Sequence, residues 1–313
     1  MRYLLLLAAA ALTLSGCGTD ATGQARQPVS STTPPPVDPS YWSTAPQTDA
    51  QRAEVATRAR LIDVCALVPR TELAELGAVR EVVNDQTDSC RVELGGEGSD
   101  TYELNWASMI MFDDVPRPGA SVVPLGAASL SLMPEHTPTA TERSCSAIAR
   151  FPAGAALYLD ATTFPSTDPC ARLETVAAGA VERWLTAPPQ GSSPDTQLTV
   201  LHGADPCAVR ALLEGTGPFG SPTLKNCGFT YRGVDVVVSY ENRGPLGDAT
   251  VQMPDGRTAH SIDDTSYTVV VGPALPGEPS YFGPSAPVVD VFADSPEVAT
   301  EVLRQVLTLF PVA

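Results

Sequence analysis

The chain contains two copies of one pattern, and this internal repeat constrains its fold more than any other feature. Residues 168–184 align with residues 294–310 without a gap. A stretch rich in Pro, Gly and Ser separates the two copies, as is typical of an interdomain linker. The sequence therefore predicts two tandem domains of one fold, at residues 49–187 and 197–313, joined by a linker at residues 188–196.

Each copy is predicted to begin with a short helix and to close with a longer one. Asp63 and Asp205 each stand two residues before a cysteine, where an Asp side chain caps a helix N-terminus. Pro169 and Pro296 fall in the first turn of the closing helices, a position that Pro favours. Apolar residues then recur at spacings of three and four, which places them on one helix face. They are Leu173, Val176, Ala177, Ala180, Val181 and Trp184 in the first copy, and Val298, Val302, Val306, Leu309 and Phe310 in the second.

Between these helices, alternation of apolar and polar residues with period two indicates strands. The predicted strands lie at residues 89–94, 102–112, 128–133, 145–151 and 155–160, and at residues 226–231, 234–240, 250–253, 267–271 and 288–292. Taken in this order, the strands of the two copies are expected to correspond one to one. A helix with one apolar face covers one side of such a sheet. The predicted fold class is α+β, with two tandem domains, each an antiparallel sheet with a short N-terminal helix and a longer closing C-terminal helix.

One pair of cysteines is present in both copies. Cys65 matches Cys207, because both follow an Asp at the start of the opening helix. Cys90 matches Cys227, because both stand in the first predicted strand. A pair that both copies keep is expected to form a disulfide, and disulfides are typical of exported proteins.

The two remaining cysteines of the predicted domains occur only in the first copy. Cys145 falls opposite Tyr267 and Cys170 falls opposite Pro296, so both are absent together from the second copy. Joint absence is expected if the two residues bond each other, and each bridge stabilises the fold by about 3 kcal/mol. The predicted disulfides are Cys65–Cys90, Cys145–Cys170 and Cys207–Cys227.

The N-terminus carries an export signal. Arg2 and an apolar run rich in Leu and Ala precede Leu-Ser-Gly-Cys, and the run is too short to span a membrane as a stable helix. The ending resembles the bacterial lipobox, which implies cleavage before Cys17, attachment of diacylglycerol and palmitate there, and a lipid anchor on the extracytoplasmic face of the cell membrane. Residues 1–16 are then a lipoprotein signal peptide, and residues 17–48 a disordered tether rich in Pro, Ser and Thr. An ordinary signal peptide with an incidental cysteine is the alternative.

The charge of the chain excludes one class of partner. With 19 basic and 36 acidic residues the net charge is −17, and Lys225 is the single lysine. Such a field repels phosphate backbones and anionic lipid surfaces. We therefore expect no nucleic acid as partner. Besides the membrane that holds the lipid anchor, the expected partners are an envelope protein, a wall polymer or a small ligand.

No enzyme or metal motif stands out. The sequence has no Gly-x-Ser-x-Gly, no His-Glu-x-x-His, no phosphate-binding loop and no Cys-x-x-Cys. Cys170 and Cys207 follow Asp-Pro at helix starts, where the helix dipole favours a reactive thiolate, but disulfide bonding is the preferred prediction. Three histidines fall in predicted surface loops without metal spacing: His136, His202 and His260.

Acidic residues form the last candidate site. Adjacent or near carboxylates occur at Asp113, Asp114, Asp263 and Asp264, and at Asp85 and Asp88 near a cysteine. None follows the Asp-x-Asp-x-Asp-Gly pattern of a calcium loop, so solvated turns are predicted. A pair of carboxylates acting as acid and base stays open, because their separation in space is unknown. We expect no catalytic residue, no metal and no cofactor.

The openings of both copies carry a family resemblance. Residues 63–69, Asp-Val-Cys-Ala-Leu-Val-Pro, and residues 205–208, Asp-Pro-Cys-Ala, resemble the Asp-Pro-Cys-Ala-Leu domain of actinobacterial secreted lipoproteins of unknown function. The chain departs from that pattern at Val64, where Pro is usual, and in holding two copies. That family is similar, at the level of fold, to the extracytoplasmic sensor domains of mycobacterial receptor kinases.

The resemblance supplies no catalytic residues. Together with the export signal it implies a membrane-anchored lipoprotein with a binding or sensing role in the cell envelope. The alternative is an envelope hydrolase with a dispersed acidic site.

Overall fold

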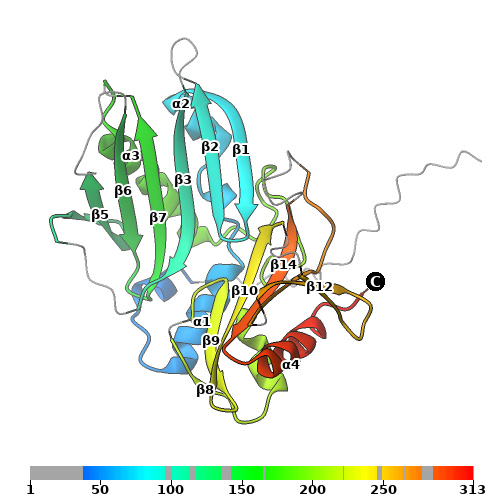
Figure 1. Cartoon of the computed structure of the whole chain (residues 1–313). Helices are drawn as coiled ribbons and strands as arrows, with labels where there is room; N and C mark the ends of the chain where they lie inside the picture. The colour runs from blue at the N-terminus through cyan, green and yellow to red at the C-terminus, as the bar shows by residue number, and fades with distance from the viewer. Residues whose placement is uncertain are drawn as a thin grey trace, which may run out of the picture. The chain divides into compact units, whose positions relative to one another are not determined.

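A computed structural model describes most of the chain after residue 37 (Figure 1). The described residues are 38–95, 101–112, 118–134, 142–164, 166–220, 222–244, 249–263, 265–276 and 285–312. Several predicted features lie outside them: Cys17, the first part of the tether, His136, Asp113, Asp114 and Asp264, together with the side chain of Asp85.

The first domain is a seven-stranded antiparallel sheet whose strands follow the order β1-β2-β3-β7-β6-β5-β4. Its strands are β1 (Ala78–Gln86), β2 (Ser89–Gly95), β3 (Thr101–Ile110), β4 (Ser121–Leu125), β5 (Ala128–Pro134), β6 (Arg143–Arg150) and β7 (Ala155–Thr163). Its helices are η1 (Pro39–Ser43), α1 (Asp49–Arg60), η2 (Cys65–Leu67), α2 (Arg70–Leu76) and α3 (Pro169–Thr186). In Figure 1, α3 lies behind β6 and β7, so the opposite face of this sheet is turned to the viewer.

The second domain repeats this architecture strand for strand, in the order β8-β9-β10-β14-β13-β12-β11. Its strands are β8 (Gly217–Pro218), β9 (Asn226–Tyr231), β10 (Val234–Arg243), β11 (Ala249–Gln252), β12 (Thr258–Asp263), β13 (Ser266–Val270) and β14 (Ala286–Ala293). The 3-10 helix η3 (Pro206–Leu212) opens it and α4 (Pro296–Leu307) closes it. The structure confirms the prediction of an α+β chain with two tandem antiparallel sheets.

The closing helices confirm the gapless alignment through the side chains they bury. α3 buries Leu173, Val176, Ala177, Ala180, Val181 and Trp184, and the chain around α4 buries the matching Ala299, Val302, Leu303, Val306, Leu307 and Phe310. The N-caps differ by one position. Asp168 caps α3, whereas Ser295, and not Asp294, accepts the capping hydrogen bond of α4. The exposed Leu309, predicted to be in the core, lies outside it because the helix ends at Leu307.

The strand registers correct part of the predicted alignment. Cys90 pairs with Trp106 and Cys227 with Val238, which makes β3 the counterpart of β10. Continuing across both ladders, β5 matches β12, so the counterpart of residues 128–133 is not residues 250–253 as predicted. The segment 250–253 belongs to the edge strand β11, which matches β4.

The same registers also correct which residue of the second copy is equivalent to Cys145. Ala147 pairs with Leu159 on β7, and Tyr267 pairs with Val291 on β14. Leu159 and Val291 occupy equivalent positions of the two sheets. Tyr267 is therefore the counterpart of Ala147, and the residue two positions earlier, Thr265, takes the place of Cys145. The prediction that Tyr267 replaces this cysteine was wrong by two residues.

The folded part begins before the predicted end of the tether. η1 starts at Pro39, and the side chain of Trp42 is fully buried against Trp184 and Phe151. The ring centroids of the two Trp side chains lie 5.4 Å apart. One large aromatic anchor therefore holds residues 39–43, which composition alone assigns to a tether, against the first domain.

Candidate functional site

An Asp side chain precedes one cysteine of every disulfide in the same local arrangement. The backbone N–H of Cys65, Cys170 and Cys207 donates to the carboxylate two residues earlier, at 3.0 to 3.1 Å. The three bridges are Cys65–Cys90, Cys145–Cys170 and Cys207–Cys227, as predicted. Bonded cysteines have no thiolate to offer, so the reactive-thiol alternative fails at Cys170 and Cys207.

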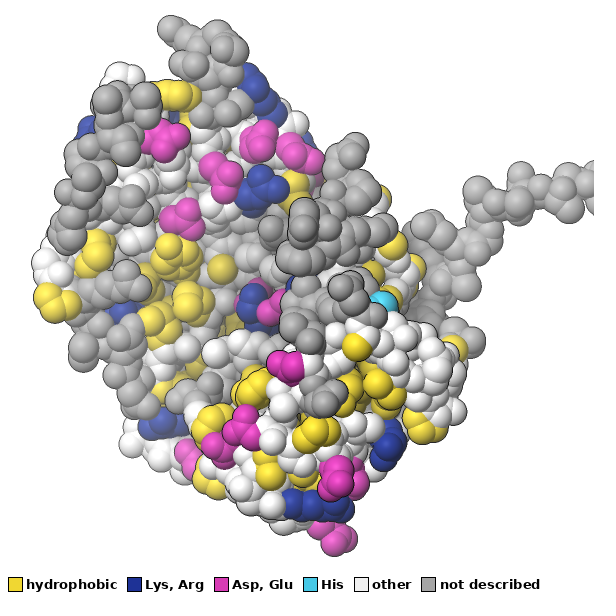
Figure 2. Space-filling model, in the orientation of Figure 1, with side chains coloured by type: hydrophobic (Ala, Val, Ile, Leu, Met, Phe, Trp, Pro, Cys, Tyr) yellow, Lys and Arg dark blue, Asp and Glu magenta, His cyan; other side chains and the backbone are white. Residues whose placement is uncertain are grey.

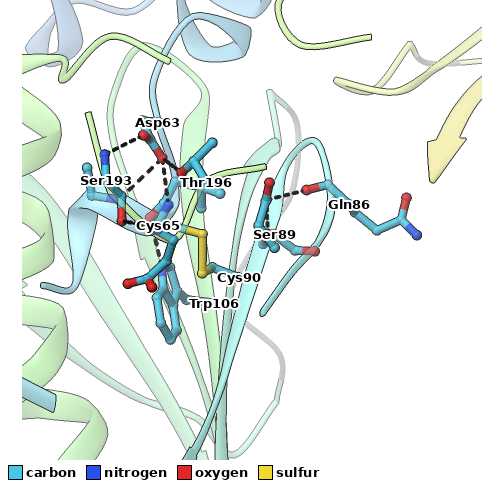
Figure 3. Close-up of a disulfide and its surroundings, with 12 residues drawn as sticks. Asp63, Cys65, Gln86, Ser89, Cys90, Trp106, Ser193 and Thr196 are labelled. Carbon is cyan, nitrogen blue, oxygen red and sulfur yellow. Dashed lines mark hydrogen bonds between the residues drawn. A yellow bond between two sulfur atoms is a disulfide. The ribbon is translucent and has the colours of Figure 1, made fainter. Parts of the chain in front are cut away.

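Asp63 connects the first disulfide to the linker between the domains (Figure 3). Its carboxylate is fully buried and also accepts hydrogen bonds from the Ser193 backbone at 2.8 Å and from the Thr196 hydroxyl at 2.6 Å. Next to it, the indole of Trp106 donates to the Val64 carbonyl at 2.8 Å. These donors satisfy the hydrogen-bonding capacity of the buried Asp63 carboxylate. The Asp at this position of the motif therefore has a structural role.

Arg60, at the end of α1, ties the first domain to the second. Its guanidinium donates to the Leu224 carbonyl at 2.8 Å and lies 3.1 Å from the carboxylate of Asp205. The Arg60 side chain is only 7% exposed, and Leu224 packs into the core of the first domain. Burial lowers the pKa of Arg60, and the neighbouring Asp205 opposes that shift. The two copies therefore share a buried polar junction.

This junction contains a small cavity. Arg60, Asp88, Lys225 and the buried Tyr240 are among its lining residues, and its volume is about 10 Å³. The Tyr240 hydroxyl makes no hydrogen bond with the described residues, and burial raises the pKa of Tyr240 well above its ordinary value. Such a volume holds about one water molecule. The cavity is therefore far too small for an organic ligand.

His202 and His260 depart from their prediction as surface loops. The Nδ1 atom of His202 accepts a hydrogen bond from the Thr199 backbone at 2.9 Å, and its Nε2 atom is buried. Burial lowers the pKa of His202 from 6.5 to about 4. His260 lies in β12, paired with Thr268. Among the described residues, no group of three or more His, Cys, Asp or Glu side chains could hold a metal ion.

The closing helix covers one face of each sheet, and the ladders align the two opposite faces residue by residue. This opposite face is partly exposed on the first sheet, whereas on the second sheet it buries Thr268 and Val288. One cross-strand row on the first sheet runs Ala107, Tyr158, Ile148, Ser131 and Val122. The matching row on the second sheet runs Ser239, Asp290, Thr268, His260 and Thr250. The first row is mainly apolar, whereas every residue of the second is polar.

The apolar row of the first sheet lies outside the core and is partly exposed: Ala107, Tyr158 and Ile148 are half-buried and Ser131 is buried. Val122 is 49% exposed, and Met109, two residues along β3 from Ala107, is 36% exposed. The apolar side chains that pack against the first core do not include these residues or Ile148 and Tyr158. Figure 2 shows hydrophobic side chains gathered over the lower part of this face. We call Ala107, Tyr158, Ile148, Val122 and Met109 the apolar face.

Carboxylates flank the apolar face at one end. The amide of Asn105 donates to Glu103 and to Asp160 at 2.9 Å each, which holds these two carboxylates together. Arg91 lies 3.7 Å from Glu93 and 3.8 Å from Glu103. Two carboxylates, Glu93 and Glu103, therefore share the Arg91 guanidinium, and Figure 2 shows acidic and basic side chains above the hydrophobic ones.

On the second sheet the equivalent face is internally paired. Arg243 contacts Asp290 at 2.6 Å and Glu241 at 2.9 Å, and the Thr268 hydroxyl donates to Asp290 at 2.5 Å. Burial raises the pKa of Asp290, which these two donors oppose. Glu241 occupies the position that Met109 holds on the first sheet. Arg243, Asp290, Glu241 and Thr268 thus pair with one another on this face.

No family model, curated protein or solved structure matches the chain. Within the described residues, no helix is long and apolar enough to cross a membrane. Sequence reasoning did not single out the apolar face. One signal could have revealed it: residues 106–111 read Trp-Ala-Ser-Met-Ile-Met, with apolar side chains on both faces of one strand.

Proposed function

We propose that this protein is an extracytoplasmic lipoprotein, held on the cell membrane by diacylglycerol and palmitate at Cys17, that binds a partner without catalysis. The apolar face of the first sheet is the binding surface. The observation that carries this proposal is the contrast between the copies: the first sheet exposes Met109, whereas the second sheet has Glu241 at the equivalent position, ion-paired with Arg243. The fold itself therefore does not require an apolar surface there.

The location of the protein follows from two separate features. Three disulfides suggest an oxidising, extracytoplasmic compartment. The lipobox-like ending at Cys17 supports an anchor, because two or more acyl chains hold a protein stably at a membrane. Replacing Cys17 with Ala should release the protein into the soluble fraction. Equal partitioning of the Cys17→Ala variant and the native chain into detergent would contradict the anchor.

Photo-crosslinking in intact cells tests the binding surface. We would place p-benzoylphenylalanine at Met109 and, as a matched control, at Glu241, its counterpart on the second sheet. An adduct of defined mass is expected from position 109 and not from position 241. It should disappear when Ile148→Thr and Val122→Thr bring in the residues that the second sheet has there. Equal adducts from both positions, or none from position 109, would end the proposal.

A further inference from the structure

We infer that the junction between the two copies is a two-fold interface of the kind that homodimers use, with side chains that fit only when unlike copies pair. The partner of the first domain at this surface is the second domain, or another domain that carries the same junction residues as the second. This inference goes beyond the proposed binding function and does not depend on the apolar face.

Equivalent residues of the two copies meet at the junction. Leu61 and Gly203 each stand four residues before the first cysteine of their copy. A Cβ atom added to Gly203 would lie 3.2 Å from the Cδ2 atom of Leu61. Asp88 and Lys225 each stand two residues before the second cysteine, and the Asp88 carboxylate lies 4.0 Å from the Lys225 ammonium. A residue that meets its own equivalent in this way lies next to a two-fold axis.

Contacts beside this axis are reciprocal. Arg60 of the first copy lies 3.1 Å from the carboxylate of Asp205 in the second. The equivalent of Arg60 is His202, and the equivalent of Asp205 is Asp63. Burial lowers the pKa of His202 and Asp63 opposes that shift, just as Asp205 opposes the effect of burial on the pKa of Arg60. Such reciprocity is characteristic of an isologous interface, in which one patch meets its own counterpart.

The same backbone hydrogen bond supports each half of the junction. The N–H of Ser108 donates to the Asp88 carbonyl at 2.8 Å, and the N–H of Tyr240 donates to the Lys225 carbonyl at 2.9 Å. The strand registers make Ser108 the equivalent of Tyr240. The two patches therefore have the same backbone framework and differ in their side chains.

These side chains differ in size and charge in a complementary way. The cavity at the junction is lined by both members of four equivalent pairs: Ala59 and Leu201, Thr87 and Leu224, Asp88 and Lys225, and Ser108 and Tyr240. The first copy supplies the smaller side chain of each pair and the second copy the larger. At the contact of Leu61 with Gly203 the order is reversed.

Pairing of like copies would lose this fit. Two first copies would bring Asp88 against Asp88 and Leu61 against Leu61. Two second copies would bring Lys225 against Lys225, and two Tyr240 side chains to a cavity of about 10 Å³. An interface becomes specific when wrong partners meet like charges and steric clashes as well as when the right one meets attraction. Charge and size together therefore select the unlike pair.

Cutting the linker of the folded protein tests the interface. We would insert a protease recognition sequence between the exposed Gly191 and Ser192 of the full chain carrying Cys17→Ala, and cleave it after folding. Native mass spectrometry should then show a one-to-one complex of the two fragments, and no pairs of like fragments after dilution and reconcentration. Separation of the fragments on cleavage, or like pairs in comparable amounts, would overturn the inference.

Exchange of the charges at the axis tests the selection by charge. Asp88→Lys and Lys225→Asp each bring like charges together and should weaken the complex of the fragments about tenfold at low salt. The double variant should recover to within about threefold of the native chain, because the opposite charges meet again. Glu301→Lys, which breaks the contact with Arg232 inside the second domain, is the control and should leave the dissociation constant unchanged. No recovery in the double variant, or equal weakening by Glu301→Lys, would contradict selection by charge.

A single substitution tests the selection by size. Ser108→Tyr gives the first copy the residue of the second and should weaken the complex about tenfold through overpacking. Ser108→Ala keeps a small side chain and should change the dissociation constant less than about twofold. Circular dichroism of the uncut chains checks that both variants fold. Equal dissociation constants for the two variants would contradict the complementary sizes.

Discussion

The first domain has three fully buried Trp side chains, Trp42, Trp106 and Trp184. In the second domain, the position equivalent to Trp106 holds Val238, and the position equivalent to Trp184 holds Phe310. The first domain also has a second disulfide, Cys145–Cys170, that the second lacks. Strand order and the first disulfide are common to both. This difference teaches that the fold tolerates large changes of core volume, provided that each position keeps its apolar character and its facing partners.

The largest expected effect compares the two aromatic anchors of the closing helices. Trp184→Ala removes a fully buried ring that contacts both Trp42 and Phe151, and we expect it to lower the free energy of unfolding by about 4 kcal/mol. Phe310→Ala removes a smaller, 8% exposed ring packed on Tyr240, with an expected loss of about 3 kcal/mol. Urea unfolding followed by circular dichroism measures both. A larger loss at Phe310 would contradict the idea that the first core depends more on its aromatic anchor.

The next largest loss of stability is expected from removal of the disulfide that only the first domain has. Replacing Cys145 and Cys170 together with Ala should cost about 3 kcal/mol, since the loop they close is no longer restricted in the unfolded chain. Non-reducing peptide mapping should still show Cys65–Cys90 and Cys207–Cys227. A peptide that links Cys65 or Cys90 to Cys145 or Cys170 in the native protein would refute the equivalence of the two copies.

The junction tests whether the two domains are energetically separate. Arg60→Met leaves the Leu224 carbonyl and the Asp205 carboxylate without their buried donor, and we expect a loss of about 2 to 3 kcal/mol. Arg304→Met, at an exposed position of α4, is the control, with an expected change within about 0.5 kcal/mol. Equal urea midpoints for the two variants would show that the junction adds nothing and that the copies fold independently.

The smallest effect depends on pH and comes from His202. Because burial lowers the pKa of His202 to about 4, the unfolded chain binds a proton more readily than the folded one between pH 6.5 and pH 4. The stability that depends on neutral His202 is present above pH 6.5 and falls as the pH falls, by about 2 kcal/mol at pH 5. Unfolding of the native chain and of His202→Asn at both pH values measures it. The same pH dependence in the variant would exclude His202 as its source.

The sequence predicted the parts of the fold that depend on local chemistry or on the repeat. Asp two residues before a cysteine predicted the caps, because a carboxylate there accepts from free backbone N–H groups. The absence of both Cys145 and Cys170 from the second copy predicted their bond, even though the residue equivalent to Cys145 was placed two positions too far along the chain. β1 was missed, because residues such as Arg80 and Glu81 break its alternation and its stability comes from pairing with β2.

The candidate site itself could not be predicted in the same way. Whether Ile148 or Ala147 faces the helix depends on strand register, and a shift of one residue exchanges the two faces of a strand. That register follows from ladders between segments far apart in the chain, so the apolar face exists only once β3, β7, β6, β5 and β4 are paired.

Local signals in the sequence by themselves determined the two copies, their closing helices and their three disulfides, because capping, periodicity and cysteine spacing act within short stretches of chain. Tertiary structure alone decided that Arg60 is buried against Leu224, that His202 stays neutral, and that the sheet face opposite the closing helix is apolar in the first domain and ion-paired in the second. Those properties arise from contacts between residues distant in sequence, where burial sets the cost of a charge and register sets the side of a sheet on which each side chain lies.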